Sequence, residues 1–250
     1  MAEDLLVGIH PVLEALRAGR TLNRIWVADG VRRPEVREIL ELARQYRVPV
    51  QKVDRDYLRR LSGSLPSQGV AARVAPTSYA SWSEVVADLA RGQGPALLLA
   101  LDQIEDPQNL GALLRTAEAA GVGAVVVPAR RAAPVTAAVA RASAGAVAYV
   151  RVARVTNLAR ALGEVKDLGL RVVGLSADGE HNLFSLDLRV PLALVVGGEA
   201  RGLRRLVREK CDYLARLPML GRVNSLNASA AAAVALYEVV RQRCFMNNLP

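Results

Sequence analysis

The chain has 250 residues, of which 52% are hydrophobic and 4% are aromatic. This content excludes a disordered protein, and the scarcity of aromatic residues argues against a platform that stacks the bases of single-stranded nucleic acid. The net charge is +9, and all but three of the 33 basic residues (Lys52, Lys166 and Lys210) are arginine. A GC-rich genome would enrich arginine by itself, but the basic excess favours a polyanionic partner, most plausibly nucleic acid.

The few cysteines and histidines are too dispersed for a zinc site or a disulfide framework. They are Cys211, Cys244, His10 and His181, and none has metal-ligand spacing. The N-terminus has no signal-peptide pattern, and the longest apolar run, residues 95–101, is too short to span a bilayer. We therefore expect a cytoplasmic protein with no metal and no membrane association.

The first 75 residues alternate between helix and strand patterns and predict a small α/β domain. Helices are expected at 11–18 and 34–46, and strands at 24–28, 48–53 and 69–74. The connecting loops are rich in arginine. Residues 76–94 contain a short helix at 83–91 and end in glycines, so we assign 1–75, 76–94 and 95–250 as first domain, linker and second domain.

The second domain begins with a continuous apolar run, as is typical of a strand that a parallel sheet buries on both faces. Strands alternating with helices predict an α/β fold. The expected strands are 96–101, 124–127, 171–175, 192–196 and 213–217. The expected helices are 109–120, 134–143, 203–210 and 227–243.

Three segments of this domain combine glycines and polar residues with strong apolar runs. The first is LDQIEDPQNLGALLRTAEAAG (101–121), in which Asn109 is the expected N-cap of a helix. That helix carries Arg115 among apolar neighbours. A lone arginine on a helix is usually a solvated surface charge, and for this segment alone a functional role is no more than equally supported.

The second segment is LALVVGGEARG (192–202), where a buried strand runs into Gly197-Gly198 and then Glu199. Glycines at such a turn let the backbone approach a ligand closely. The third is LPMLGRVNSLNASAAAAVALYE (217–238), where an irregular stretch precedes an alanine-rich helix. Asn227 suits the N-cap of that helix, which is compatible with a ligand role as well. The alanine face permits close packing against another helix, from a second subunit for example.

Taken together and in this order, the three segments resemble the three motifs of the SpoU (TrmH) family of RNA ribose methyltransferases. The N-terminal pieces GIHPVLEAL (8–16) and QGVAA (68–72) also resemble the substrate-binding domain often attached to that family. One departure is Pro66-Ser67, where the family often has Asn-His before Gln-Gly. The departure puts any role for a histidine there in doubt, but not the chemistry.

The resemblance implies a fold that periodicity alone would not suggest. It implies a C-terminal SPOUT α/β domain with a deep trefoil knot, which is an exception to the ordinary topology rule. A small α/β domain like ribosomal protein L30e would precede it. The resemblance also implies a homodimer with the active site near the dimer interface.

By motif position, the resemblance assigns three groups of functional residues. The catalytic group would face a pocket where the three segments converge, and a permanently charged arginine there would stabilise a developing alkoxide rather than act as a base. The catalytic residues would be Arg115, Asn109, Glu199 and Asn227. The cofactor pocket would be lined by Leu175, Gly197, Gly198, Leu217, Met219, Ser225 and Leu226. RNA-binding candidates in the first domain are Arg17, Arg20, Arg24, Arg32 and Arg33, although any one of them is at least as well read as a solvated surface charge.

The function implied is methyl transfer from S-adenosylmethionine to a ribose 2′-hydroxyl of structured RNA, with a guanosine of 23S rRNA as the leading target. Within the same class, the alternatives are a tRNA methyltransferase or an rRNA-methylating resistance enzyme. A non-catalytic RNA-binding protein on the same fold is a rival of another class. An unrelated α/β enzyme acting on small molecules fits the basic excess less well.

Overall fold

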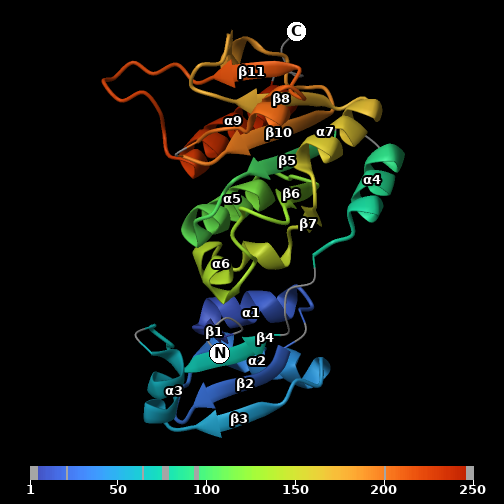
Figure 1. Ribbon diagram of the computed structural model, residues 1–250. Coiled ribbons are helices and arrows are strands. Elements are labelled where there is room, and N and C mark those ends of the chain that lie inside the picture. The colour runs from blue at the N-terminus through green and yellow to red at the C-terminus, as the bar shows by residue number, and fades with distance from the viewer. Residues whose placement is uncertain are drawn as a thin grey trace. The chain divides into compact units, whose positions relative to one another are not determined.

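The computed structural model describes residues 5–20, 22–63, 65–74, 79–92, 96–199 and 201–245. The contacts between residues divide the chain into two compact units. Figure 1 shows the chain coloured by residue number. One unit comprises Met1–Ser78 with Pro134–Tyr149, and the other comprises Tyr79–Ala133 with Val150–Pro250. The domain boundaries expected at residues 75–76 and 94–95 lie outside the described residues.

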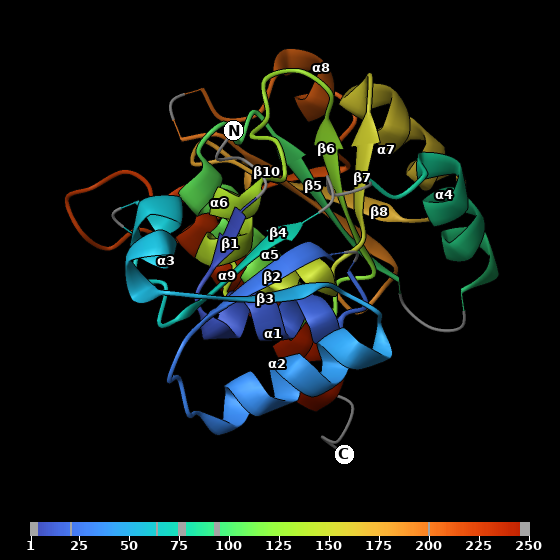
Figure 2. The same cartoon turned by 90° about the horizontal axis from the view of Figure 1, so that it is seen from below.

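The first unit is built on a four-stranded sheet in the order β1-β4-β2-β3. β4 is antiparallel to both of its neighbours, and β2 is parallel to β3. Helices α1 and α2 lie side by side (Figure 2). The strands are β1 (Leu5–Val7), β2 (Leu22–Ala28), β3 (Val50–Val53) and β4 (Val70–Val74). The helices are α1 (Ile9–Arg17), α2 (Pro34–Gln45), α3 (Arg55–Ser62), α6 (Ala137–Ala142) and the 3-10 turn η1 (Ala146–Ala148).

Helix α3 is not among the elements that the sequence pattern predicts. Its sequence, RDYLRRLS, has few apolar residues to reveal a helical period. The helix is stabilised by Asp54, whose carboxylate accepts a hydrogen bond from the backbone N–H of Tyr57 at 2.5 Å. Leu58 is the buried contact, and it packs against Trp26 and Ala28 of β2. One capping carboxylate and one deeply buried leucine therefore hold this helix in place.

Residues 134–149 pack within the first unit although they follow a strand of the second. Val139, Ala140 and Val147 are buried there. The guanidinium of Arg141 donates a hydrogen bond to the carbonyl of Leu5 at 3.3 Å. A stretch of sequence inserted in the second unit thus completes the core of the first.

The second unit has seven parallel strands in the order β7-β6-β5-β10-β8-β11-β9. The strands are β5 (Leu97–Asp102), β6 (Ala124–Pro128), β7 (Val152–Val155), β8 (Arg171–Leu175), β9 (His181–Asn182), β10 (Leu192–Gly197) and β11 (Tyr213–Arg216). The helices are α4 (Trp82–Arg91), α5 (Pro107–Ala119), α7 (Leu158–Asp167), α8 (Arg205–Arg208), α9 (Ala228–Phe245) and the 3-10 turn η2 (Leu183–Ser185).

The parallel α/β fold predicted for this unit is confirmed. β5 is buried along its whole length, as its apolar run indicated. One face of the sheet packs against α4, α7 and α8, and Figure 1 shows α5 and α9 on the side away from α7. β7, β9 and α7 were not anticipated, and α8 is shorter than the helix expected at 203–210. None of the helices in the described ranges is long and apolar enough to cross a membrane.

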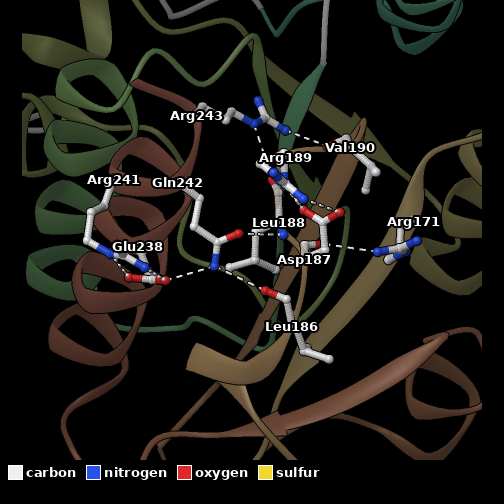
Figure 3. A network of polar contacts seen from close by, with 10 residues as sticks. All are labelled: Arg171, Leu186, Asp187, Leu188, Arg189, Val190, Glu238, Arg241, Gln242 and Arg243. Carbon is white, nitrogen blue, oxygen red and sulfur yellow. Dashed lines mark hydrogen bonds and ion pairs between the residues drawn. The ribbon is translucent and has the colours of Figure 1, made fainter. Parts of the chain in front are cut away.

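The C-terminal half of α9 is fastened to the segment before β10 (Figure 3). Gln242 is buried, and its carboxamide accepts a hydrogen bond from the N–H of Leu188 at 2.8 Å and donates one to the carbonyl of Leu186 at 3.0 Å. It also donates to the carboxylate of Glu238 at 2.8 Å. These hydrogen bonds of Gln242, which we call the clamp, fix α9 relative to the central strand β10, and Asn227 directly precedes the first turn of α9.

Candidate active site

A cavity of about 460 Å³ opens where β8, β10 and β11 end. The carboxyl ends of these parallel strands meet at one edge of the sheet, which is where open α/β sheets bind their ligands. Leu175 ends β8, Gly197 ends β10, and Leu217 follows β11 directly. The volume lies within the range of about 300–1,000 Å³ typical of small-molecule sites.

The structure brings together at this cavity all seven residues expected to contact a cofactor. The loop after β11 supplies one wall, the turn after β10 a second, and the end of β8 a third. The seven are Leu175, Gly197, Gly198, Leu217, Met219, Ser225 and Leu226. The second and third sequence segments therefore converge in space as expected.

The two glycines of the turn are required by the chain's own packing. A Cβ built on Gly197 would collide with the backbone of Gly202, and one built on Gly198 would collide with the carbonyl oxygen of Gln103. Both residues also line the cavity. The sequence had indicated glycines that admit a ligand, whereas the structure shows that they first admit the neighbouring backbone.

A buried ion pair holds this turn against the end of β5. The carboxylate of Asp102 is fully buried and accepts hydrogen bonds from the backbone N–H of Arg204 at 2.8 Å and from its Nε at 2.7 Å. The N–H of Gly198 donates to the carbonyl of Asp102 at 2.8 Å. Both ends of the turn are thus tied to one residue.

Three of the expected catalytic side chains form one hydrogen-bonded set at the edge of the cavity. The amide of Asn109 donates to Glu199 Oε1 at 3.0 Å, and the amide of Asn227 donates to Asn109 Oδ1 at 3.0 Å. Asn227 also donates to the same carboxylate oxygen of Glu199. These residues belong to the first, second and third segments, so the set joins all three.

A second cavity of about 360 Å³ adjoins the first through this set. The two share Gly198, Glu199, Arg201 and Ala228, and the smaller one also includes Asn109. Its remaining lining comes from the loop that follows β5, residues 103–106, and from Arg131. It lies between β5 and β10, where the strand order reverses and α/β folds place ligands.

The two helix caps expected in these segments have different outcomes. Asn227 is confirmed as the cap of α9, because its Oδ1 accepts from the N–H groups of Ser229 at 2.9 Å and Ala230 at 3.3 Å. Asn109 is not a cap. Asp106 caps α5 instead, accepting from the N–H of Asn109 at 2.9 Å. The side chain of Asn109 is thereby left for the hydrogen-bonded set.

Arg115 does not reach either cavity within one chain. It is exposed on α5 and lines neither space. Arg115 is six positions after Asn109, which places it about 240° around the helix axis and about 9 Å along it. The expectation that its guanidinium faces the converging segments is therefore not met in a single chain.

Several cavity residues were not anticipated from the sequence. Asp178 is joined to Arg208 by an ion pair of 3.0 Å, and Arg208 also donates to Ser176 Oγ at 2.8 Å. The hydrogen bonds from Arg208 and then Ser176 lower the pKa of Asp178 to about 2. The sequence does carry a signal for these residues: residues 176–180, which directly follow β8, are polar and contain a glycine, as in the other segments. The unanticipated polar lining residues are Ser176, Asp178, Arg201, Arg208 and Asn224.

The five arginines expected to bind RNA differ in their exposure and in their hydrogen-bond and ion-pair partners. Arg17 is held between Glu38 at 2.7 Å and Glu14 at 2.9 Å, so its charge is neutralised. Arg24 is exposed and donates to Gln51 Oε1 at 3.4 Å. Arg20 is half-buried, which lowers its pKa. Arg32 and Arg33 line a separate cavity of the first unit.

The main cavity fits a ligand with an apolar body and charged groups of both signs. Leucine, valine and methionine side chains line it together with the carboxylates of Asp178 and Glu199 and the guanidinium groups of Arg201 and Arg208. S-adenosylmethionine has this character, since it carries an adenine ring, a sulfonium, an ammonium and a carboxylate. Among the described residues, no group of His, Cys, Asp and Glu is placed to hold a metal ion.

Comparisons with known proteins show which family this chain belongs to. Residues 96–237 match the model of the SpoU rRNA methylase family, and residues 5–80 match a model described as RNA 2′-O ribose methyltransferase substrate binding. A Staphylococcus haemolyticus protein described as a TrmH family tRNA/rRNA methyltransferase is 43% identical over 243 residues, which is 97% of each chain.

Two solved structures extend the comparison. The SpoU methyltransferase AviRb from Streptomyces viridochromogenes, in complex with its cofactor AdoMet, is 26% identical with a TM-score of 0.79 over 96% of this chain and 90% of that one. An RNA 2′-O ribose methyltransferase is 30% identical with a TM-score of 0.75 over 96% and 88%. This chain belongs to the SpoU family of S-adenosylmethionine-dependent RNA methyltransferases.

Proposed function

We propose that the protein methylates a ribose 2′-hydroxyl of structured RNA, most specifically a guanosine of 23S rRNA. The observation that carries the proposal is the set formed by Asn109, Glu199 and Asn227, which stands between a cavity suited to the cofactor and a second, smaller cavity. The match of residues 5–80 to a 2′-O ribose methyltransferase substrate-binding model supports the ribose as acceptor.

The two cavities are assigned different ligands. S-adenosylmethionine, when bound, supplies a methyl group made electrophilic by its sulfonium. The seven expected residues of the larger cavity would hold it through apolar side chains and backbone groups. The smaller cavity, with Gln103, Asn109 and Arg131 in its lining, would hold the target nucleotide.

The hydrogen-bonded set would orient the acceptor for in-line attack. Glu199 accepts from both asparagine amides, so the three side chains restrict one another's rotamers. Such fixed polar groups lower the barrier because they need no reorganisation when the hydroxyl loses its proton. Asn227 is held further by its capping bonds to α9.

We propose that Arg115 stabilises the developing alkoxide. In this proposal the Arg115 side chain of one copy of the chain reaches the active site of a second copy. A homodimer would explain why a residue of the first motif is exposed and lies outside the cavities of its own chain. The face of α9 around Ala230 leaves Val234 and Tyr237 40% and 51% exposed, which suits burial against a partner helix. The trefoil knot also remains a prediction from the family resemblance.

Methyl transfer from labelled cofactor to total RNA, followed by mapping of the product, tests the proposal. We expect label on a ribose 2′-oxygen of 23S rRNA. Arg115→Ala should lower the rate of transfer by about 100-fold or more, while calorimetry shows nearly unchanged cofactor binding.

The position of the label decides between RNA classes. Label mapped to tRNA would replace the rRNA target but keep the chemistry, and label on a base would refute 2′-O transfer. An Arg115→Ala variant that kept near-normal transfer would remove this residue from the mechanism. The matched control is Arg160→Ala, an exposed helical arginine of the same unit that pairs with Glu164.

A further inference from the structure

The first unit contains a cavity of about 610 Å³ whose rim carries four arginines. The loop between β2 and α2 contributes Arg32 and Arg33, and α3 contributes Arg55 and Arg59. The first pair is among the RNA-binding candidates from the sequence, and the second pair is not. Folding of α3 brings the two pairs to one space.

The floor of this cavity is apolar and belongs to the core. Ala28, Val31, Leu58 and Leu65 line it and also pack in the cluster that joins α3 to the sheet. Gly69 closes the floor, because a Cβ there would collide with Val31 Cγ2. The space is therefore a formed hollow between structured elements.

Among the described residues that line the cavity, none carries a carboxylate. Asp56 partly offsets one of these charges, because it pairs with Arg59 at 3.3 Å while both side chains remain largely exposed. Such an exposed pair contributes little and exchanges readily for another anion. Arg17 on α1 differs, since two glutamates neutralise it.

The start of α2 adds to the positive potential. Arg33 is the N-cap residue of α2, and its side chain makes no capping hydrogen bond to that helix. The N-terminal end of a helix of 12 residues carries partial positive charge. Four arginines therefore line a hollow with an apolar floor, and the start of α2 directly follows two of them.

We propose that this cavity binds the backbone of the RNA substrate at an unstacked nucleotide. The guanidinium groups of Arg32, Arg33, Arg55 and Arg59 would contact phosphates in bidentate fashion, and the apolar floor would cover one face of the nucleotide. The proposal rests on the RNA substrate of the proposed function, and it assigns the part of that substrate which the first unit recognises.

Paired double variants test the site. Arg55→Ala with Arg59→Ala removes two cavity arginines of α3, whereas Arg37→Ala with Arg44→Ala removes two exposed arginines of α2 that do not line the cavity. Both change the net charge equally. Affinity for 23S rRNA transcribed in vitro would be measured at several salt concentrations, together with KM and kcat for methyl transfer to the same RNA.

We expect the α3 pair to weaken RNA binding about tenfold or more and to reduce the slope of log affinity against log salt by about 1.4 to 1.8. KM for RNA should rise with kcat retained at saturating RNA, and cofactor affinity should not change. The α2 pair should change RNA affinity less than about threefold. Arg32→Ala with Arg33→Ala should reproduce the α3 result from the opposite rim.

Equal losses in the two pairs would overturn the proposal, because they would show that only net charge matters. Unchanged RNA affinity in the α3 variant would overturn it as well, provided that circular dichroism shows a folded protein. Failure of the wild-type protein to methylate RNA would refute the proposed function instead. Affinity measurements separate these two failures, since they do not depend on turnover.

Discussion

Asp102 shows how one buried charge can fix a functional turn. Its carboxylate is fully buried at the end of β5, while Arg204 remains 36% exposed. A buried carboxylate is tolerated only when it is paired and hydrogen-bonded. Here the partner is the far end of the turn that contains Gly198 and Glu199, so the charge specifies the path of the backbone beside the cofactor cavity.

Asp102→Asn should therefore destabilise the protein and loosen the site. Asparagine turns an amide donor toward the donors of Arg204, and we expect a loss of about 2–3 kcal/mol in the free energy of unfolding. Cofactor affinity should fall as well, because the turn lines the cavity. Urea unfolding and calorimetry measure the two effects.

Asp187→Asn is the matched control for that variant. Asp187 pairs with Arg189 on the surface of the same unit, where its side chain is 45% exposed. An exposed pair contributes about 0–1 kcal/mol. If the two substitutions were equally mild, the buried pair would not be what holds the turn.

Asn227 combines a structural role with a role in the site. Its Oδ1 caps α9, and its Nδ2 donates to Asn109 and Glu199. A side-chain amide has a donor and an acceptor at opposite corners, so one residue can serve both roles. Neither aspartate nor serine offers both functions at this reach, although each would cap the helix.

At the level of elements, α9 is positioned from both ends. Its first turn meets the hydrogen-bonded set, and its last turns are clamped to residues 186–190 (Figure 3). Arg243 contributes by donating to the carbonyl of Val190 at 2.7 Å. The hydrogen bonds from Arg241 lower the pKa of Glu238, which keeps that carboxylate charged beside Gln242. Polar contacts of this kind define the position of a smooth alanine-rich helix that apolar packing alone would leave free to slide.

Gln242→Leu tests the clamp. Leucine keeps the size of the side chain but leaves the N–H of Leu188 without its buried acceptor. Each unsatisfied group costs about 1–3 kcal/mol, so we expect a loss of about 2–4 kcal/mol by chemical denaturation. Gln45→Leu, at an exposed position of α2, should change stability by less than about 0.5 kcal/mol. Comparable stability of the two variants would show that the clamp is dispensable.

At the level of the whole molecule, the chain crosses between its two units more than once. Residues 134–149 leave the second unit after β6, contribute α6 and η1 to the first, and return before β7. The units are therefore not separable by cutting the chain once. A fragment that begins near residue 79 would lose the core against which Val139 and Val147 are buried.

Truncation to residues 79–250 should accordingly yield a protein that aggregates or binds an apolar dye. Val139→Ser with Val147→Ser should improve the solubility of this fragment, because those side chains are exposed in it. The same two substitutions in the full chain should destabilise the first unit by about 1–3 kcal/mol for each valine. Light scattering measures the solubility of the fragment, and thermal unfolding measures the stability of the full chain. If the two substitutions harmed both the fragment and the full chain, or improved both, the assignment of residues 134–149 to the first unit would be contradicted.

The sequence by itself determined the parallel α/β fold of the second unit, the positions of most of its strands and the seven residues at the main cavity. Apolar runs that are buried on both faces carry a strong local signal, and a motif in three parts is specific when its order is kept. Only the tertiary structure decided that α3 is a helix, that Asp106 rather than Asn109 caps α5, and that Arg115 lies outside the cavities of its own chain. These features depend on contacts between residues far apart in sequence and on the rotation of each helix about its axis, neither of which a local pattern of residue types records.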